Sequence, residues 1–225
     1  MVDAPKSLVP EFFDGTAETY DKVVKYATFG RDIFWKSQIV NQIPNSSYIL
    51  ELACGTGILT GQIVQKFPHS KIIGVDITKS YLEIAKKKLT SYKNISFVCQ
   101  NAETIDLGQE FDCIVSSYIP KYCNPKILIQ NCIAHLKPKG KIILHDFTYP
   151  QNSIVRFFWN LYFEILGISG NFIPEWKHAF IKLPILIRSS KWTDEYKKEL
   201  EERRFSVKVR HFTCGCCTIL SATRF

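Results

Sequence analysis

An α/β fold, with helices on both faces of a mostly parallel sheet, is predicted by two strand-like stretches and the helical pattern between them. Residues 48–53 are apolar except for Glu51, as expected for a central parallel strand that is covered on both faces. Residues 58–67 follow with apolar side chains at helical spacing, and residues 71–77 form the next apolar strand. A strand, a helix and a second strand in this order are the repeating unit of a parallel sheet.

The turn between the first strand and its helix contains Gly55 and Gly57. Glycine adopts backbone angles that other residues avoid and lets a ligand approach the chain closely, and the N-terminus of the following helix faces the same turn. Asp76 ends the next strand, where a carboxylate can accept hydrogen bonds from two vicinal ribose hydroxyls. The dinucleotide fingerprint requires a third glycine three residues after Gly57, but Leu59 and Thr60 fill that region. These features predict a nucleotide-like ligand and weaken the case for NAD.

Hydrophobic periodicity places the remaining elements. The helix over residues 32–42 carries Ile33, Phe34, Ile39 and Val40 on its predicted apolar side. The other predicted elements are helices at 16–28, 80–89, 125–136 and 190–205, and strands at 95–99, 111–117, 140–147, 207–212 and 217–222. The two N-terminal helices precede the first strand, so we expect them at the ligand edge of the sheet or outside it.

Three stretches carry a resemblance to a known class of enzymes. Glu51-x-Ala-Cys-Gly-Thr-Gly57, Asp76, and Leu136-Lys-Pro-Lys-Gly-Lys-Ile142 resemble the signature of class I S-adenosylmethionine (SAM) dependent methyltransferases. The resemblance implies a Rossmann-like sheet of seven strands that ends in an antiparallel hairpin, with the last strand inserted beside the fifth. It also implies one domain over residues 1–225. Its expected parts are a helical cap (1–44), a SAM-binding core (45–149), a substrate-lid insertion (150–192), and a C-terminal helix and hairpin (193–225).

The same resemblance implies a cofactor site for SAM, with S-adenosylhomocysteine as the product and no metal. The residues it assigns to this site are Tyr20, Glu51, Ala53, Gly55, Gly57, Asp76, Ile77, Asn101, Ala102 and Ser117. Asn101 stands where the class commonly has an aspartate that accepts a hydrogen bond from the exocyclic amine of adenine. An asparagine carbonyl can accept the same hydrogen bond.

Further motifs resemble the ubiquinone and menaquinone C-methyltransferase family. They are Tyr20-Asp21, Gly30-Arg31, Trp35-Lys36, His145-Asp146-Phe147-Thr148-x-Pro150, and the tail from Leu183-Pro to Thr213-x-Gly215. The resemblance implies methylation of a ring carbon in a small hydrophobic acceptor, such as a prenylated quinol precursor. Lys121 and Tyr122 stand where this family has Arg-Asn, and lysine cannot reproduce a bidentate arginine contact.

Carbon methylation of a quinol or phenol also requires a base that removes a hydroxyl proton, because the ring carbon must become nucleophilic. Asp146, His145 and Tyr118 all follow or end strands at the edge where open α/β sheets bind ligands. We therefore regard these three residues as the catalytic candidates, and their spacing does not choose among them.

Residues 150–192 form a connection much longer than an ordinary loop between elements. Residues 154–166 within it are strongly aromatic but too few to span a bilayer. We interpret this segment as a lid and as a wall for a greasy substrate. A second interpretation places residues 154–168 at a membrane surface, with Trp159, Tyr162 and Arg156 at the headgroup level.

The formal net charge of +8 favours an anionic partner surface, either nucleic acid or lipid headgroups. Enzymes that methylate base amino groups tend to carry Asn- or Asp-Pro-Pro-aromatic after the fourth strand, and here the sequence is Ser117-Tyr-Ile-Pro120. RNA cytosine-5 methyltransferases place a proline before the nucleophilic cysteine, whereas Cys123 follows a tyrosine. We therefore expect a small-molecule acceptor and no nucleic acid.

The cysteines and the absence of a long apolar run in the sequence lead to two further expectations. Cys214-Gly-Cys216-Cys217, with His211 nearby, lacks the C-x-x-C spacing of a zinc site, so we expect no metal. No signal-peptide pattern occurs either, which favours a cytoplasmic protein, with peripheral contact at the inner membrane face as a further option. The oligomeric state stays open. Alternative functions are methylation of another small molecule or of RNA, and SAM binding without transfer.

Overall fold

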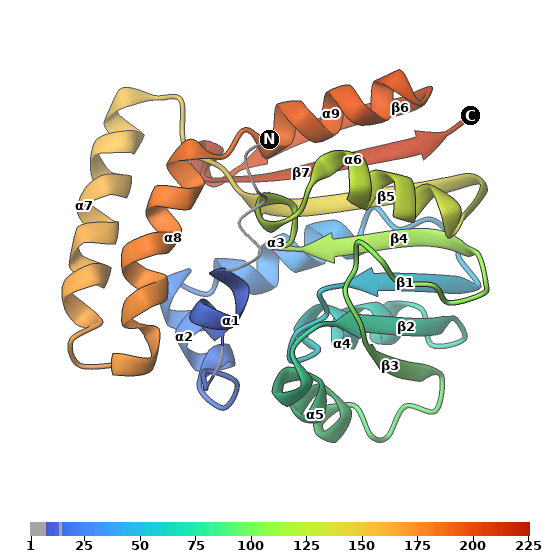
Figure 1. The fold of residues 1–225 in the computed structure, drawn as a ribbon, viewed down its shortest axis with the longest axis horizontal. Helices are drawn as coiled ribbons and strands as arrows, with labels where there is room; N and C mark the ends of the chain where they lie inside the picture. The colour runs from blue at the N-terminus through green and yellow to red at the C-terminus, as the bar shows by residue number, and fades with distance from the viewer. Residues whose placement is uncertain (1–7, 14) are drawn as a thin grey trace.

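A seven-stranded sheet runs through the computed structural model, which describes residues 8–13 and 15–225 (Figure 1). The strands are β1 (Tyr48–Leu52), β2 (Lys71–Asp76), β3 (Ile95–Cys99), β4 (Phe111–Ser117), β5 (Leu136–Phe147), β6 (Phe205–Phe212) and β7 (Cys217–Arg224). Their order across the sheet is β3-β2-β1-β4-β5-β7-β6. The five strands from β3 to β5 are parallel, whereas β7 is antiparallel to both β5 and β6. This arrangement confirms the predicted sheet, including the insertion of the last strand beside the fifth.

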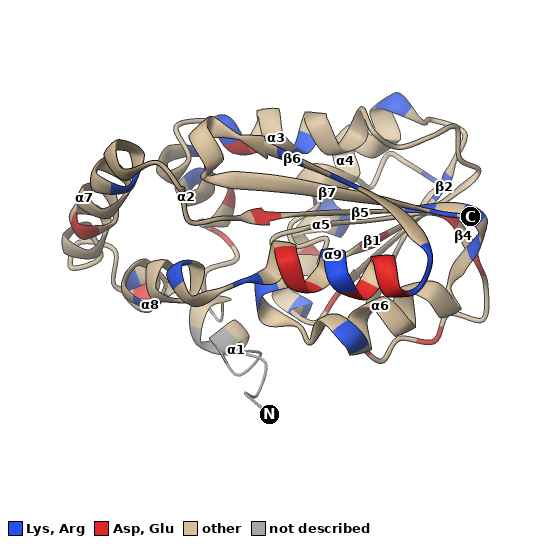
Figure 2. Ribbon diagram, turned by 90° about the horizontal axis from the view of Figure 1, so that it is seen from above, with Lys and Arg blue, Asp and Glu red and all other residues tan. Residues whose placement is uncertain are grey.

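Helices cover both faces of the sheet (Figure 2). They are α1 (Leu8–Phe13), α2 (Tyr20–Ala27), α3 (Arg31–Val40), α4 (Ile58–Lys66), α5 (Lys79–Lys88), α6 (Pro125–Ala134), α7 (Ser153–Ser169), α8 (Lys177–Ser189) and α9 (Trp192–Glu202). Because successive strand residues point to opposite faces, Ile114 and Leu144 pack in one core cluster with residues of α6 and α9. Cys113 and Ile143 pack in the other cluster with residues of α3 and α4.

Two neighbouring helices, α7 and α8, lie beyond the carboxyl ends of the parallel strands (Figure 1). The two helices pack against each other, and α8 also packs against α1. The predicted insertion at 150–192 therefore contains two helices. We expected the next clear helix after the aromatic segment only at residue 192, and this expectation is wrong, because α8 runs through Pro184 without ending there.

The buried side of α3 differs from the one predicted. Ile33 and Phe34 are 53% and 41% exposed, whereas Asp32 and Lys36 are buried and form an ion pair with each other. Residues four apart lie on the same side of a helix, so the charged pair faces the interior next to Trp35. The apolar pattern alone could not predict that the charged side of α3 is buried, because the two charges are stabilised by their ion pair rather than by solvation.

In the part of the chain that the structure describes, no helix combines the length and the apolar composition that crossing a bilayer requires.

Asp112 joins the starts of three neighbouring strands at the edge of the sheet opposite α7 and α8. Its carboxylate accepts hydrogen bonds from the backbone N–H groups of Ser47 and Tyr48 at 2.9 and 2.8 Å and from Lys137 Nζ at 2.7 Å. Burial alone raises the pKa of Asp112, but these donors outweigh burial and hold the pKa below its usual range.

We predict that Asp112→Asn lowers the free energy of unfolding at pH 7 by about 1.5 kcal/mol, the value of hydrogen bonds to a charged group. Because the folded pKa is depressed, this contribution is present above the unfolded pKa of about 3.9 and is lost as the pH falls through the folded pKa. Urea unfolding of the parent and the variant, at pH 7 and at a pH below the folded pKa of Asp112, measures this contribution. Asp106→Asn, whose exposed carboxylate accepts a hydrogen bond from the Gly108 N–H in a local turn, is the control. Equal losses for both variants would contradict the assignment.

Candidate active site

The turn after β1 has the backbone geometry that its glycines predict. Ala53, Gly55 and Gly57 all have positive φ angles, at 54°, 54° and 80°. A Cβ on Gly57 would also lie 3.1 Å from Leu89 Cδ1 and 3.2 Å from Ala85 Cβ, so both the angle and the close packing of α4 on α5 require glycine here. The turn therefore brings backbone N–H groups to the carboxyl edge of the sheet.

Asp76 fixes this turn to the end of β2. Its Oδ2 accepts a hydrogen bond from the Gly55 N–H and its Oδ1 accepts one from the Thr78 N–H, each at 2.8 Å. Burial raises the pKa of Asp76 despite these donors. Each carboxylate oxygen can accept a second hydrogen bond, so Asp76 still offers acceptors to a ligand with hydroxyl groups.

A cavity of about 450 Å³, which we call the cofactor cavity, lies over the ends of β1 to β4. Every predicted cofactor residue except Glu51 and Gly57 lines it, and the lining consists of Val9, Phe13, Tyr20, Ala53, Gly55, Val75, Asp76, Ile77, Thr78, Lys79, Ser80, Tyr81, Gln100, Asn101, Ala102, Ser117, Tyr118, Ile119, Tyr122 and Cys123. The Asp76 carboxylate, at the end of β2, can accept hydrogen bonds from the ribose hydroxyls of SAM, and the Asn101 amide, just after β3, can accept one from the adenine amine. The residues present therefore fit this cofactor.

Glu51 and Gly57 do not line the cofactor cavity. Glu51 is buried in β1 and its Oε2 accepts a hydrogen bond of 2.6 Å from Thr60 Oγ1. Burial raises the pKa of Glu51 to about 8. Gly57 is the residue before α4. Both residues support the turn from behind.

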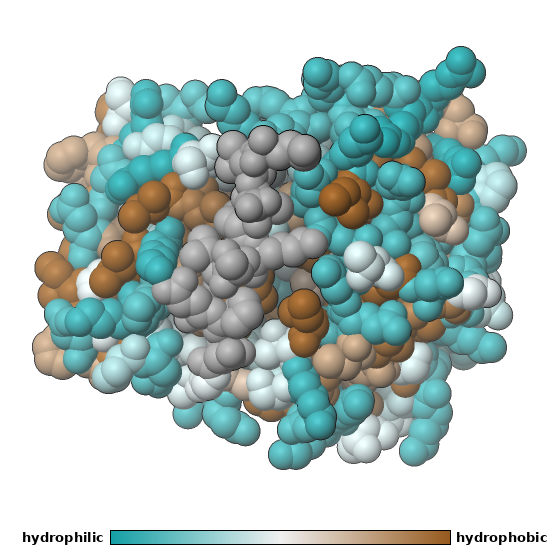
Figure 3. Space-filling view, viewed as in Figure 1, coloured by the Kyte–Doolittle hydropathy of each residue, from teal (hydrophilic) through white to brown (hydrophobic). Residues whose placement is uncertain are grey.

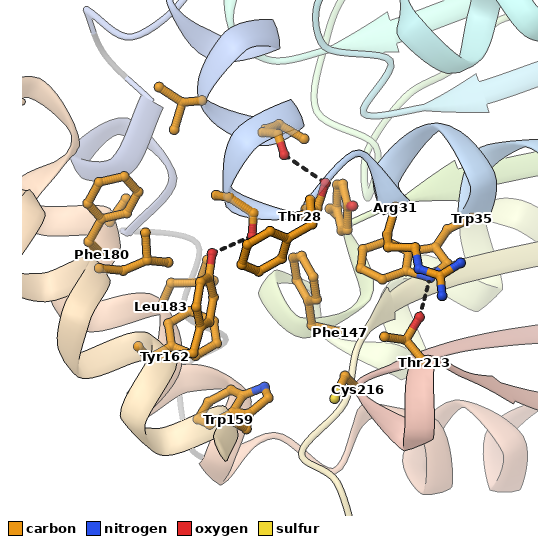
Figure 4. A pocket seen from close by; sticks show the side chains of 18 of the residues that line it. Thr28, Arg31, Trp35, Phe147, Trp159, Tyr162, Phe180, Leu183, Thr213 and Cys216 are labelled. Atoms are coloured by element: carbon orange, nitrogen blue, oxygen red, sulfur yellow. Dashed lines mark hydrogen bonds between the residues drawn. The ribbon is translucent and has the colours of Figure 1, made fainter. Parts of the chain in front are cut away.

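A second cavity, which we call the apolar cavity, has a volume of about 460 Å³ and lies between the edge of the sheet and the α7–α8 pair (Figure 4). Its lining is mostly aromatic and aliphatic and consists of Phe12, Phe13, Tyr20, Val23, Val24, Ala27, Thr28, Phe29, Arg31, Trp35, Tyr118, Lys121, Tyr122, Phe147, Val155, Phe158, Trp159, Tyr162, Phe163, Leu166, Trp176, Ala179, Phe180, Leu183, Thr213, Cys214 and Cys216. Trp35 Nε1 donates a hydrogen bond of 2.9 Å to Thr213 Oγ1, which ties α3 to the C-terminal hairpin at the cavity wall.

Four aromatic residues line both cavities and form the wall between them: Phe13, Tyr20, Tyr118 and Tyr122. Tyr118 follows β4 with φ at 73°, an angle that is uncommon outside glycine. Its ring stacks on Phe147, with centroids 4.8 Å apart and an angle of 15° between the planes. Tyr118 is therefore a rigidly held part of the wall that the two cavities share.

A buried network fixes the hydroxyl of Tyr118. Its Oη donates a hydrogen bond of 2.7 Å to Asp32 Oδ1, and Asp32 in turn pairs with Lys36, whose Nζ lies 4.6 Å from the centroid of the Tyr118 ring. Burial, followed by the negative charge of Asp32, raises the pKa of Tyr118 well above its ordinary value. The phenol is therefore protonated at neutral pH, with its proton directed at a carboxylate.

His145 and Asp146, the other two catalytic candidates, line neither cavity. Because β5 continues to Phe147, both residues lie within the strand and their side chains project from opposite faces of the sheet. Both are fully buried there, His145 next to Trp35 of α3 and Asp146 against Lys121. His145 lies 2.8 Å from both Ser117 Oγ and Cys217 Sγ, and burial lowers its pKa well below the usual range.

Asp146 accepts a hydrogen bond of 2.6 Å from Lys121 Nζ. Burial raises the pKa of Asp146 and lowers that of Lys121, and the attraction between the two opposes both shifts. Asp146 therefore acts on the apolar cavity only through Lys121, which lines it.

The sequence did not indicate Asp32 as a site residue. The signal that could have found it is the Asp32–Lys36 spacing of four around Trp35, which places a carboxylate and an ammonium next to each other on one side of a helix. Its connection to Tyr118 joins residues far apart in the chain, and only the structure shows it.

The fold and the site together define a class I SAM-dependent methyltransferase. The sheet has the strand order of this class, and Gly55, Asp76 and Asn101 lie together at the carboxyl ends of its parallel strands. The ubiE/COQ5 methyltransferase family model matches residues 1–224, and the chain belongs to this family.

Curated relatives and solved structures agree with this class. A demethylmenaquinone methyltransferase from Thermotoga maritima is 27% identical over 206 residues, which cover 87% of this chain and 86% of that protein. A malonyl-acyl-carrier-protein O-methyltransferase from Priestia megaterium is 31% identical over 148 residues, which cover 63% of this chain but only 52% of that protein. The solved magnesium protoporphyrin IX methyltransferase from Synechocystis, with bound SAH, shares the fold at a TM-score of 0.68 and 16% identity, covering 98% of this chain and 100% of that chain.

Replacing Asp76 tests the cofactor cavity. We predict that Asp76→Ala weakens SAM binding by about 1.5 to 3 kcal/mol, because hydrogen bonds to a charged group are lost. Isothermal titration calorimetry with SAM measures the change. Asp194→Ala, which removes an exposed carboxylate from the first turn of α9, is expected to bind SAM like the parent protein. Parent-like binding by Asp76→Ala would show that the ribose binds elsewhere.

Proposed function

We propose that the protein transfers a methyl group from SAM to a ring carbon of a small hydrophobic aromatic acceptor, such as a prenylated quinol precursor. The observation that carries this proposal is the apolar cavity, which shares an aromatic wall with the cofactor cavity. Its volume of about 460 Å³ lies in the range of pockets that hold drug-sized ligands. A substituted ring and part of an apolar tail fit this space. The name of the Thermotoga relative supports the same class of acceptor.

The protein's main task in this reaction is to hold donor and acceptor in line. When bound, SAM supplies an activated methyl group, and the remaining acceleration comes from positioning. The stacked rings of Tyr118 and Phe147 offer a flat surface to an aromatic acceptor. Trp35, which is buried beside Phe147 with ring centroids 5.8 Å apart, keeps this surface in place.

The network behind Tyr118 can remove the acceptor's hydroxyl proton. In this step the acceptor O–H bond breaks and its proton passes to Tyr118 Oη, while the proton of Tyr118 passes along the existing hydrogen bond to Asp32. Tyr118 is a phenol before and after the step, Asp32 becomes neutral, and the acceptor becomes a phenolate with a nucleophilic ring carbon. Among the three catalytic candidates, Tyr118 is thus the one that we assign to contact the acceptor.

Lys121 can stabilise the phenolate that this step produces. Its side chain is enclosed, lines the apolar cavity, and lies with Nζ 5.5 Å from the centroid of the Tyr118 ring. A cation in a cavity with few other polar groups interacts strongly with developing negative charge. Lys121 has the same charge as the arginine at the corresponding position of the quinone methyltransferases, but it cannot form the bidentate hydrogen bonds of an arginine.

Incubation with SAM labelled in its methyl group and a demethylated, prenylated quinol tests the proposed function. We expect the label to appear on a ring carbon, as identified by mass spectrometry and NMR of the product. Label on an acceptor oxygen, or SAM binding without any labelled quinol, would overturn it. Two measurements test RNA as the alternative acceptor. One is the affinity for RNA at several salt concentrations, and the other is an incubation of RNA with labelled SAM, which would place the label in RNA if RNA were the acceptor.

Replacing the hydroxyl of Tyr118 tests the proton path. We predict that Tyr118→Phe, which keeps the ring and the Asp32–Lys36 pair, lowers kcat at pH 7 by about 100-fold or more, the usual contribution of a general base. The affinity for SAM should change little. The loss should shrink as the pH approaches about 10, where a phenolic acceptor ionises by itself.

Tyr149→Phe is the control for this variant, since Tyr149 contacts Trp159 and Asn160 but lines neither cavity. A Tyr118→Phe rate that is low at every pH would indicate a purely structural role for the hydroxyl.

A further inference from the structure

The outer side of α7 carries an apolar stripe in addition to the side that lines the apolar cavity. Trp159 is the one buried residue of α7. The exposed residues of the stripe follow one another at helical spacing and are Ile154, Phe157, Phe158, Leu161, Ile165 and Ile168. Figure 3 shows apolar residues exposed among hydrophilic ones over α7 and α8. A helix that is apolar on two sides is expected in a protein core or at a lipid surface, and α7 is not in the core.

The apolar cavity reaches solvent beside this stripe. Phe29 and Phe158 line the cavity, yet they are 81% and 61% exposed, so they lie where the cavity opens. The Phe29 ring contacts Tyr162 of α7, with centroids 5.5 Å apart, and Tyr162 Oη donates a hydrogen bond to the Ala27 carbonyl. The entrance is therefore formed by α7 and the turn between α2 and α3.

Basic residues accompany the apolar residues on this pair of helices (Figure 2). Residues 151–190 contain the basic residues Arg156, Lys177, Lys182 and Arg188 and the acidic residues Glu164 and Glu175. Lys177 and Arg188 are exposed on α8 together with Ile181 and Ile185. Aliphatic and aromatic side chains mixed with lysine and arginine match the interface of an anionic bilayer, where apolar groups enter the acyl boundary and cations meet the phosphates.

We propose that the outer sides of α7 and α8 dock on the surface of an anionic phospholipid bilayer, and that the acceptor enters the apolar cavity from that bilayer. The inference rests on the proposed function, because a prenylated acceptor is itself dissolved in lipid. A cavity of about 460 Å³ takes the ring and the first part of a tail. The rest of a long tail stays in the acyl layer next to α7.

Vesicle co-sedimentation of the full chain tests this surface. We expect the protein to bind vesicles of phosphatidylcholine and phosphatidylglycerol, to bind phosphatidylcholine alone more weakly, and to lose affinity as salt is added. The double variant Phe157→Ser/Ile165→Ser, at positions that line neither cavity, should bind the anionic vesicles about tenfold more weakly or worse, because two apolar groups no longer enter the interface. The matched control is Ile127→Ser/Phe225→Ser, at exposed positions on α6 and at the C-terminus, and it should bind like the parent.

Two results would overturn the proposal. The first is that the parent protein stays in solution with vesicles of either composition. The second is that a second copy of the chain covers the stripe, so that the parent sediments as a dimer and the stripe variant as a monomer. Methylation of a short-tailed quinol in solution separates the two proposals. If it proceeds while vesicle binding fails, the docking surface falls and the proposed function stands. If vesicles bind but no quinol is methylated, the proposed function falls.

Discussion

Two lysine–carboxylate pairs lie buried beneath the wall between the two cavities, and the position of Tyr118 depends on both. Asp32, paired with Lys36, accepts the hydrogen bond of the Tyr118 hydroxyl, and Lys121, paired with Asp146, donates a hydrogen bond of 3.0 Å to the Tyr118 carbonyl. Each charge is expensive to bury without its partner, so the pairs persist together. Held from both ends, Tyr118 keeps a backbone angle that its side chain would otherwise disfavour. The strained backbone angle is therefore located in the aromatic wall that the two cavities share.

The two halves of the site come from different parts of the fold. The cofactor cavity is made by strand ends and turns of the sheet, whose geometry follows from parallel pairing. The far wall of the apolar cavity is made by α7 and α8, which are inserted between β5 and α9 and are not needed to complete the sheet. In the proposed function the sheet holds the methyl donor, while the insertion supplies the far wall of the acceptor's cavity.

The sequence predicted the parts of the structure that local patterns control. The sheet order followed from the apolar strands and the resemblance. Asp76 ends β2, and Gly55 and Asn101 lie in the turns just after β1 and β3, so all three line the cofactor cavity. Position along a strand was less informative for His145 and Asp146. They stand near the end of β5, but Trp35 covers His145 and Lys121 covers Asp146, so both side chains are buried. Asp32 and Lys36 look like solvent-facing charges in the sequence, but in the structure they are buried and pair with each other. The pattern of residues 150–192 did not predict α8, which contains Pro184 in its interior.

A crystal structure with S-adenosylhomocysteine and a quinol analogue tests the central claim, that donor and acceptor meet across Tyr118. The account predicts the nucleoside against Asp76 and Asn101, and the acceptor ring in the apolar cavity with one hydroxyl within about 2.6 to 3.2 Å of Tyr118 Oη. An acceptor ring bound outside the apolar cavity, or one whose hydroxyl groups point away from Tyr118, would contradict it.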